Sequence, residues 1–238
     1  AYSEGVKLLL SDVKNNTFTL KILLDTAWLD AEDRAYPITV DPVIQTEQEK
    51  SEMISTFVDS GHPNTAHGKK QSDLGSMYVG RKIKDFGTAK TYIKVKTLPD
   101  IGGIGSKVID ARLSVCKRNT FEINKEDLRI NAYQVTSSWN ADSLTYNNQP
   151  ESDGYILDYM LFAADNKVQP DYHDNYGYLE FKTIEITNIV RQWYEDTDKN
   201  YGILLDTENE NMNKTWCHSI QNTTYEKSRT VLTVSYLN

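Results

Sequence analysis

The feature that most restricts the fold of this chain is a long succession of short apolar runs separated by turn-forming residues. The run at 230–236 is the clearest, because Leu232, Val234 and Tyr236 alternate with more polar residues. This period-two alternation is typical of a strand with one buried face. So many short strands favour a β-sandwich or jelly roll. Comparable runs lie at 52–58, 76–79, 90–95, 106–116, 128–134, 178–185, 202–205 and 215–220.

Only one segment of the sequence has convincing helical periodicity. Thr187 or Asn188 is suited to cap its N-terminus, and Ile189, Val190 and Trp193 fall on one side of a helix. We expect that side to pack on a sheet and Trp193 to lie in the core. The sequence therefore predicts an all-β fold, a jelly-roll-like β-sandwich with one short helix.

The beginning of the chain is expected to form a small β appendage. The apolar runs at 6–10 and 18–24 flank Asn15 and Asn16. Asparagine tolerates the left-handed backbone angles of a hairpin turn, so these runs are predicted to pair. A further short strand is expected at 36–40.

The polar stretch at 45–52 indicates a linker between two parts of the chain. We therefore predict an N-terminal β lead-in segment at 1–46 and a sandwich domain at 47–238. A chain of 238 residues with 39% hydrophobic residues can bury one core of this size beside a small appendage.

The charge of the chain limits its partners. The net charge is −8, so a surface of this kind repels phosphates and nucleic acid is not expected as a partner. The longest apolar candidate, residues 8–10, is far shorter than the roughly 20 residues that cross a membrane. No membrane insertion is predicted.

The sequence offers no recognisable catalytic group. There is no GxSxG elbow, and no phosphate-binding loop or dinucleotide fingerprint. Acidic residues are numerous, but the sequence gives no positive evidence for a catalytic carboxylate pair. The chain is therefore predicted not to be an enzyme, and catalysis is the weakest of three functional hypotheses. The histidines, none with a recognisable partner pattern, are His62, His67, His173 and His218.

One oxygen-rich loop suggests a structural metal ion. Asp59 and Asn64 lie on it, and hard cations such as Ca²⁺ bind several oxygen atoms that converge from one loop. The string at 196–202 also carries alternating oxygen side chains, but its Gly comes one place late for an EF-hand, and a plain turn is favoured. Structural Ca²⁺ is therefore the one cofactor that the sequence suggests.

A tyrosine-rich segment at 171–178 is the candidate ligand-binding platform. Tyr172, His173 and Tyr176 stand among polar neighbours, and sugar rings stack on flat aromatic surfaces. Trp216 is a further candidate because its strand mixes buried and exposed positions. The alternative is a loop that only covers the sandwich.

The two cysteines, Cys116 and Cys217, each lie in a strand-like run. They form either one disulfide, as in an exported protein, or two buried thiols. There is no CxxC pair and no zinc-ligand spacing.

Several segments carry motifs that occur together in one known family. The most specific are VTSSW at 135–139 and TYNNQP at 145–150. In combination the segments between 52 and 238 resemble the bacterial DNRLRE domain, which is grouped with the family 96 carbohydrate-binding modules. Tyr146 stands where that family usually has Trp. The other matching segments are 57–59, 63–64, 68, 74, 79–80, 92–95, 108–115, 185–193, 200–204 and 229–236.

The segments 28–30 and 36–42 resemble the lead-in that precedes such domains in wall-associated and RHS-repeat proteins. The two resemblances imply a non-catalytic module of a larger bacterial surface protein, secreted or at the cell surface. They imply a polysaccharide or cell-wall glycan as its partner, beside other domains of the same polypeptide. The alternative is a structural or protein-interaction spacer of an RHS-type surface or toxin-delivery protein.

Overall fold

The chain divides into two compact units, which are described separately. Unit 1 comprises Ala1–Gln45 with Leu237–Asn238, and unit 2 comprises Thr46–Tyr236. The computed structural model describes residues 7–14, 17–31, 45–49, 53–68, 76–83, 85–98, 100–101, 108–119, 127–162, 172–174, 177–208, 213–218 and 230–236.

Unit 1 contains the expected hairpin. Strand β1 (Lys7–Lys14) pairs antiparallel with β2 (Thr17–Leu23), and the register shifts between Ser11 and Lys14. The first strand is longer than predicted. A four-residue helix, α1 (Thr26–Leu29), follows, and the strand expected at 36–40 lies outside the described residues.

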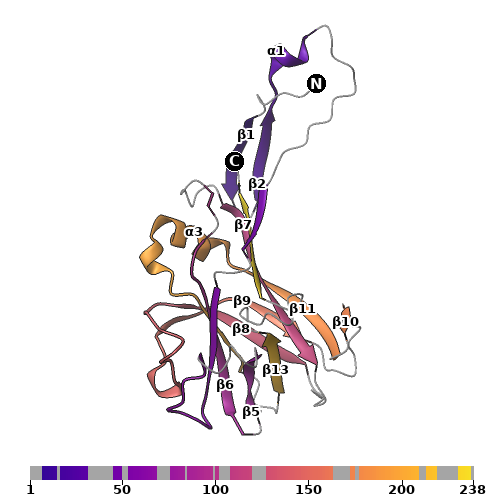
Figure 1. The fold of residues 1–238 in the computed structure, drawn as a ribbon. Coiled ribbons are helices and arrows are strands. Elements are labelled where there is room, and N and C mark those ends of the chain that lie inside the picture. The colour runs from indigo at the N-terminus through magenta and orange to yellow at the C-terminus, as the bar shows by residue number, and fades with distance from the viewer. Residues whose placement is uncertain are drawn as a thin grey trace. The chain divides into compact units, whose positions relative to one another are not determined.

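Unit 2 contains one twelve-stranded sheet, in which nine strands follow one path and three branch from it (Figure 1). The order along the path is β10-β11-β7-β13-β5-β6-β12-β8-β9, with β14 beside β7, β3 beside β14 and β4 beside β6. The strands are β3 (Gln45–Glu49), β4 (Met53–Asp59), β5 (Ser76–Ile83), β6 (Gly87–Val95), β7 (Val108–Asn119), β8 (Leu128–Val135), β9 (Ser152–Phe162), β10 (Tyr172–Asp174), β11 (Gly177–Glu185), β12 (Ile203–Asp206), β13 (Asn213–His218) and β14 (Val231–Tyr236).

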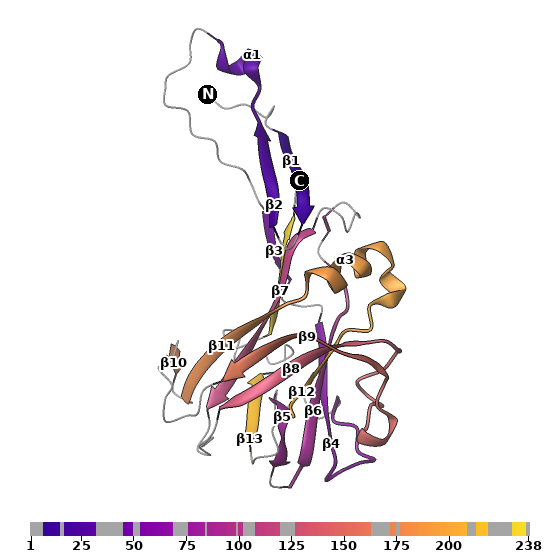
Figure 2. The ribbon, with the colours of Figure 1, turned by 180° about the vertical axis from the view of Figure 1, so that it is seen from behind.

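The path folds into two layers because β6 has different partners along its length. On one side it pairs with β4 at residues 89–95. On the other side it pairs with β12 at residues 91–93 and with β5 nearer its start. One layer is therefore β4-β6-β12-β8-β9, and the other contains β5, β13, β7, β14, β11 and β10. Figure 2 shows β8 and β9 side by side in the first layer. The predicted all-β sandwich is confirmed.

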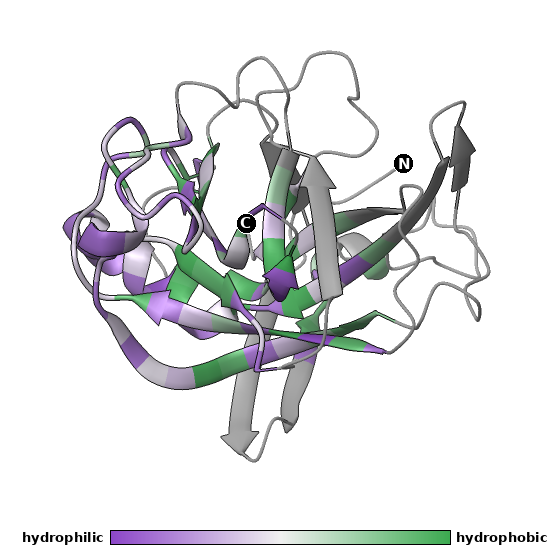
Figure 3. Cartoon of the chain, turned by 90° about the horizontal axis from the view of Figure 1, so that it is seen from below, coloured by the Kyte–Doolittle hydropathy of each residue, from purple (hydrophilic) through white to green (hydrophobic). Residues whose placement is uncertain are grey.

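The main core lies between these two layers. Ile93, Ile130 and Met160 of the first layer share one buried cluster with Val115 and Ile184 of the second. Apolar residues concentrate along the strands in Figure 3. On β14 the buried positions alternate as predicted, which places one face of that strand in the core.

Helix α3 (Thr187–Glu195) packs on the sandwich through Trp193, which is fully buried as predicted. The predicted capping role of Thr187 or Asn188 is wrong, because the N-cap residue is Ile186. The Thr187 hydroxyl instead accepts a hydrogen bond from the Ala111 backbone N–H, at 2.9 Å. The Glu185 carboxylate accepts from the Thr187 N–H at 2.8 Å and so replaces a side-chain cap.

Three strands differ from expectation. The stretch predicted to be a polar linker begins with β3, which pairs with β14. Backbone hydrogen bonds do not require apolar side chains, and polar residues are common on edge strands. Strands β9 and β10 were not predicted, and β10 occupies part of the segment expected to be a tyrosine-rich loop.

Candidate functional site

The first layer of the sandwich has a second face that points away from the core. On β8, Leu128 and Ile130 are buried in the core. Because side chains alternate along a strand, Arg129, Asn131 and Tyr133 point to the opposite side of the sheet. The register sets Asn131 of β8 opposite Tyr159 of β9 on one side and opposite Asp206 of β12 on the other. Three strands thus contribute to one outer surface.

The aromatic and polar groups of this surface contact one another. The guanidinium carbon of Arg129 lies 4.1 Å from the centre of the Tyr159 ring. The Arg129 Nε–H donates to Asn131 Oδ1 at 3.0 Å, and the Asn131 amide donates to the Tyr133 hydroxyl at 3.2 Å. A cation over a ring and two amide hydrogen bonds therefore hold these side chains in a fixed arrangement.

Strand β9 carries an unusual set of exposed apolar side chains. Tyr155 is 78% exposed, Leu161 51%, Tyr159 50% and Ile156 44%. In the described part of unit 2, the exposed large hydrophobic side chains all lie on this strand. By register, Leu161, Tyr159 and Ile156 lie opposite Arg129, Asn131 and Tyr133 of β8, and we call the outer surface formed by these six residues the β9 face. Contiguous exposed apolar side chains mark sites of interaction in folded proteins.

A charged group borders the β9 face on β12. Asp206 accepts from Arg81 at 2.7 Å, and its other oxygen lies 3.0 Å from Lys90 Nζ. All three side chains are mostly buried, with exposures of 14% for Asp206, 18% for Arg81 and 23% for Lys90. One carboxylate thus stands between two cations.

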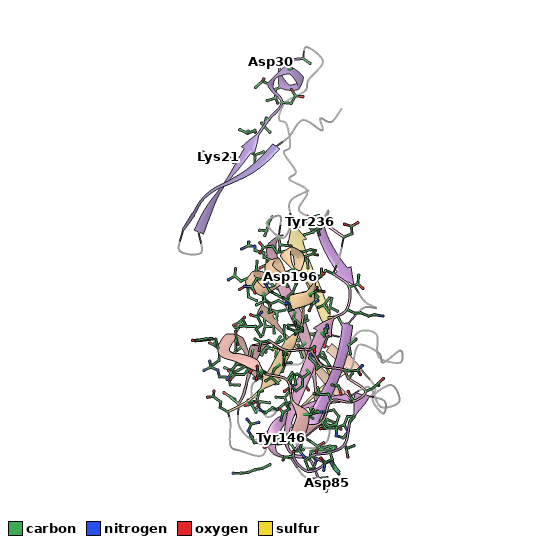
Figure 4. All side chains as sticks on the ribbon, turned by 90° about the vertical axis from the view of Figure 1, so that its left-hand side faces the viewer. Lys21, Asp30, Asp85, Tyr146, Asp196 and Tyr236 are labelled. Carbon is green, nitrogen blue, oxygen red and sulfur yellow. The ribbon has the colours of Figure 1, made fainter. Side chains whose placement is uncertain are left out.

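The other half of the outer face is covered by the loop that carries the VTSSW and TYNNQP motifs. Leu144 of this loop packs with Val58, Tyr92 and Leu204 in a second buried cluster, and Trp139 and Tyr146 lie against it. Figure 4 shows Tyr146 and Asp85 at the same end of unit 2. The motifs therefore have a structural role, and the β9 face beside them stays exposed.

Two hydrogen bonds fasten this covering loop. The Trp139 indole donates to the Tyr201 carbonyl at 2.7 Å, and the Tyr92 hydroxyl donates to Gln149 Oε1 at 3.1 Å. Burial, then the nearby Asp206 carboxylate and the Tyr146 hydroxyl, raises the pKa of Tyr92 above that of an ordinary tyrosine.

The predicted metal-binding residues have other partners in the structure. The Asp59 side chain is fully buried, and its carboxylate lies 2.9 Å from His62 Nδ1 and 2.5 Å from His67 Nε2. Asn64 Oδ1 accepts from the Asn147 amide at 2.8 Å. Within the described residues, no group of three or more His, Cys, Asp or Glu side chains is arranged to hold a metal ion. Structural Ca²⁺ stays a prediction.

Three of the four predicted ligand-binding residues lie on strands of the other layer. Tyr172 and His173 belong to β10, and Trp216 belongs to β13, opposite Tyr78 and Arg118. Two strands, β11 and β7, stand between β10 and β13. The side chains of these three residues, and the whole of Tyr176, lie outside the described part, so their role stays a prediction.

The two cysteines lie on neighbouring strands. Cys116 is buried on β7, and Cys217 of β13 is paired in register with the next residue, Lys117. The side chain of Cys217 lies outside the described part, and the disulfide stays a prediction.

Comparison with known families shows which family contains the chain that carries the β9 face. The model of carbohydrate-binding module family 96 matches residues 46–234, which is most of the chain. The chain belongs to carbohydrate-binding module family 96. The family is one of carbohydrate-binding modules, in agreement with the resemblance found in the sequence. A comparison with curated proteins found no match.

Two further observations describe this family 96 module. No helix in the described part of the chain is long and apolar enough to cross a membrane. The match spans 46–234 and therefore covers nearly all of unit 2, which contains the β9 face.

The sequence reasoning missed the β9 face. Residues 155–161, YILDYML, form a dense apolar run in which strict alternation fails. The cause is a register shift between β8 and β9, where Ala132 pairs with Asp158 but Tyr133 pairs with Ile156. The sequence signal that could have indicated this face is an apolar run with two tyrosines beside one Gly and two Asp residues.

Proposed function

We propose that the β9 face of this family 96 module binds a polysaccharide chain. The observation that carries the proposal is the concentration of exposed Ile156, Tyr159 and Leu161 on the outer side of one strand. A monomeric domain seldom leaves such a set of side chains uncovered without an interaction to make. In a carbohydrate-binding module, the partner that fits them is a glycan.

The chemistry of the face suits sugar rings. Tyrosine rings offer flat apolar surfaces to the C–H groups of a sugar, and the hydroxyl at their tip can hydrogen-bond. Arg129, Asn131 and Tyr133 add polar groups beside these rings. A strand rises about 3.3 Å per residue, so the stretch from Ile156 to Leu161 spans roughly 17 Å, enough for several linked sugars.

We further propose that the module works outside the cell, as part of a larger bacterial surface protein, and holds that protein on a polysaccharide or on the cell wall. Membership in a carbohydrate-binding family supports this setting. The DNRLRE name and the RHS-type lead-in at 1–46 belong to the same proposal. The DNRLRE name rests on the motifs between 52 and 238, and the lead-in rests on those at 28–30 and 36–42.

Affinity electrophoresis of the full chain tests the proposal. Native gels are cast with soluble xylan, β-glucan, polygalacturonate or solubilised peptidoglycan, and the mobility of the chain is measured against its concentration. We expect at least one of these to retard the wild-type chain. Tyr159→Ala should weaken that retardation by about tenfold, because stacking on one aromatic ring is lost.

Tyr159→Phe is the matched control, because it keeps the ring and removes only the hydroxyl. Its retardation should stay within about threefold of the wild-type value. Equal retardation of the wild-type chain and of an Ile156→Ala, Tyr159→Ala double variant would locate binding elsewhere. If none of the four polysaccharides retards the wild-type chain, the spacer hypothesis gains over glycan binding.

A further inference from the structure

Asn131 is a buried polar side chain in the middle of the β9 face. It is 2% exposed, although it points to the outer side of the sheet, and it lies between Tyr159 and Asp206 in register. A buried amide is costly unless its oxygen and nitrogen both have partners. Its partners therefore indicate why an amide stands there.

The two partners of Asn131 determine which way its amide points. Arg129 Nε can only donate, so the amide oxygen must face Arg129, as the 3.0 Å contact shows. The amide nitrogen then faces Tyr133 and donates to the hydroxyl oxygen, at 3.2 Å. Because the Tyr133 hydroxyl accepts this bond, its own proton remains to be donated elsewhere.

The same amide fixes the guanidinium of Arg129. One side chain amide holds the Nε–H, while the guanidinium carbon rests 4.1 Å from the centre of the Tyr159 ring. Arginine has many rotatable bonds, and ordering them before a ligand arrives removes an entropic cost of binding. Asn131 thus orients both the Arg129 guanidinium and the Tyr133 hydroxyl.

We propose that Asn131 is a positioning residue that presents the Arg129 guanidinium and the Tyr133 hydroxyl as hydrogen-bond donors to acceptor oxygens of a bound glycan. This inference rests on the proposed function of the β9 face. Asn131 itself is too buried to be the main contact, so it acts through Arg129 and Tyr133.

The first test needs no glycan. The side-chain Nε–H signal of Arg129 is followed by ¹⁵N NMR in the full chain, and its exchange with water and its order parameter are measured. Asn131→Ala should speed the exchange at least about fivefold and lower the order parameter, because the acceptor is removed. Arg112 is the internal control, because its Nε donates to Asp110 at 3.0 Å, and its signal should not change.

A second variant protects the test against misfolding of Asn131→Ala. Asn131→Asp keeps an oxygen that accepts from Arg129 but cannot donate to Tyr133. It should keep the Arg129 signal ordered and turn the Tyr133 proton inward. An Arg129 signal that is equally ordered and equally protected in wild type, Asn131→Ala and Asn131→Asp would overturn the proposal.

The second test measures binding to the polysaccharide that most retards the wild-type chain in the panel above. Asn131→Ala should weaken retardation by about threefold to tenfold, the range expected for a lost hydrogen bond. In an Arg129→Met, Tyr133→Phe background the same substitution should change retardation by less than about twofold, because its targets are gone.

The outcomes separate this inference from the function on which it rests. If Arg129→Met, Tyr133→Phe leaves retardation unchanged while Tyr159→Ala weakens it, the glycan site stands and the donor roles of Arg129 and Tyr133 are refuted. If neither variant weakens retardation, the β9 face is not the glycan site. If that double variant weakens retardation but Asn131→Ala alone does not, the glycan site stands and the positioning role of Asn131 is refuted. An effect of Asn131→Ala that persists in full in the double background also refutes it.

Discussion

At the scale of single residues, Tyr92 shows how burial and charge act on one hydroxyl. Its phenol lies beneath the covering loop, donates to Gln149, and has a raised pKa, mainly because burial disfavours the charged form. The pKa of tyrosine in an unfolded chain is about 10. Folding therefore favours the protonated phenol above that pH.

This difference predicts a pH dependence of stability. Above about pH 10 the unfolded chain releases the Tyr92 proton while the folded chain keeps it, so the contribution of Tyr92 to stability falls as pH rises. Tyr92→Phe should be less stable by about 0.5–1.5 kcal/mol at pH 8, and the gap should close above pH 10. Urea unfolding at stepwise pH values measures both.

Gln149→Ala is the control for this pH effect, because it removes the same hydrogen bond and keeps the phenol. Its unfolding free energy should run parallel to that of the wild-type chain through the alkaline range. A constant gap between Tyr92→Phe and the wild-type chain from pH 8 to 11 would contradict the assignment.

At the scale of elements, β12 illustrates how a single glycine sets a strand in place. Gly202 precedes the strand with a φ of +85°, and a Cβ there would lie 2.2 Å from the Ile93 carbonyl oxygen. The contact is with backbone of the neighbouring strand β6, which cannot rotate away. Both the angle and the close approach therefore require glycine.

Gly202→Ala should lower the unfolding free energy by about 2–4 kcal/mol, because the new methyl group pushes β12 from β6. Gly154→Ala is the matched control: its φ is +74°, but nothing lies within 4 Å of the added Cβ. That control should cost about 1–2 kcal/mol through backbone strain alone. Equal losses in the two variants, measured by thermal unfolding, would show that the contact with Ile93 is relieved.

The elements also show how far the sequence can predict this structure. Alternation and turn residues located β14 and most other strands, because their buried faces follow a period of two. Strand β9 was missed because a register shift breaks its period, and β3 because its residues are polar. Helix α3 was located from its apolar side. Its cap was not, because the Thr187 hydroxyl accepts a hydrogen bond from the distant Ala111 N–H.

At the scale of the whole molecule, the sequence predicted the class of fold and the kind of partner better than the site. The motifs that carry the family resemblance build the covering loop and the core, so they could not locate a ligand. The contacts of Asn131 and Arg129 with Tyr159 join two strands and become visible only once the register is known. Exposure, which singles out β9, is a property of the fold.

The two-unit division predicts that unit 2 is sufficient for binding. A chain of residues 44–238, which retains β3, should unfold cooperatively and should be retarded by polysaccharide as the full chain is. Circular dichroism during urea unfolding measures the cooperativity, and affinity electrophoresis measures the retardation. A loss of retardation with intact folding would assign a binding role to residues 1–43.

The pairing of β6 with β12, and of β7 with β14, determines when in synthesis the sandwich can be completed. Residues 91–93 pair with β4 on one side, but their partners on the other side lie at 203–205. Residues 108–114 likewise have one set of partners at 231–236. A polypeptide growing from its N-terminus therefore holds two incomplete layers until its final segments have been synthesised. Such distant partners slow folding, and the nascent chain must be kept from aggregating until the last strand arrives.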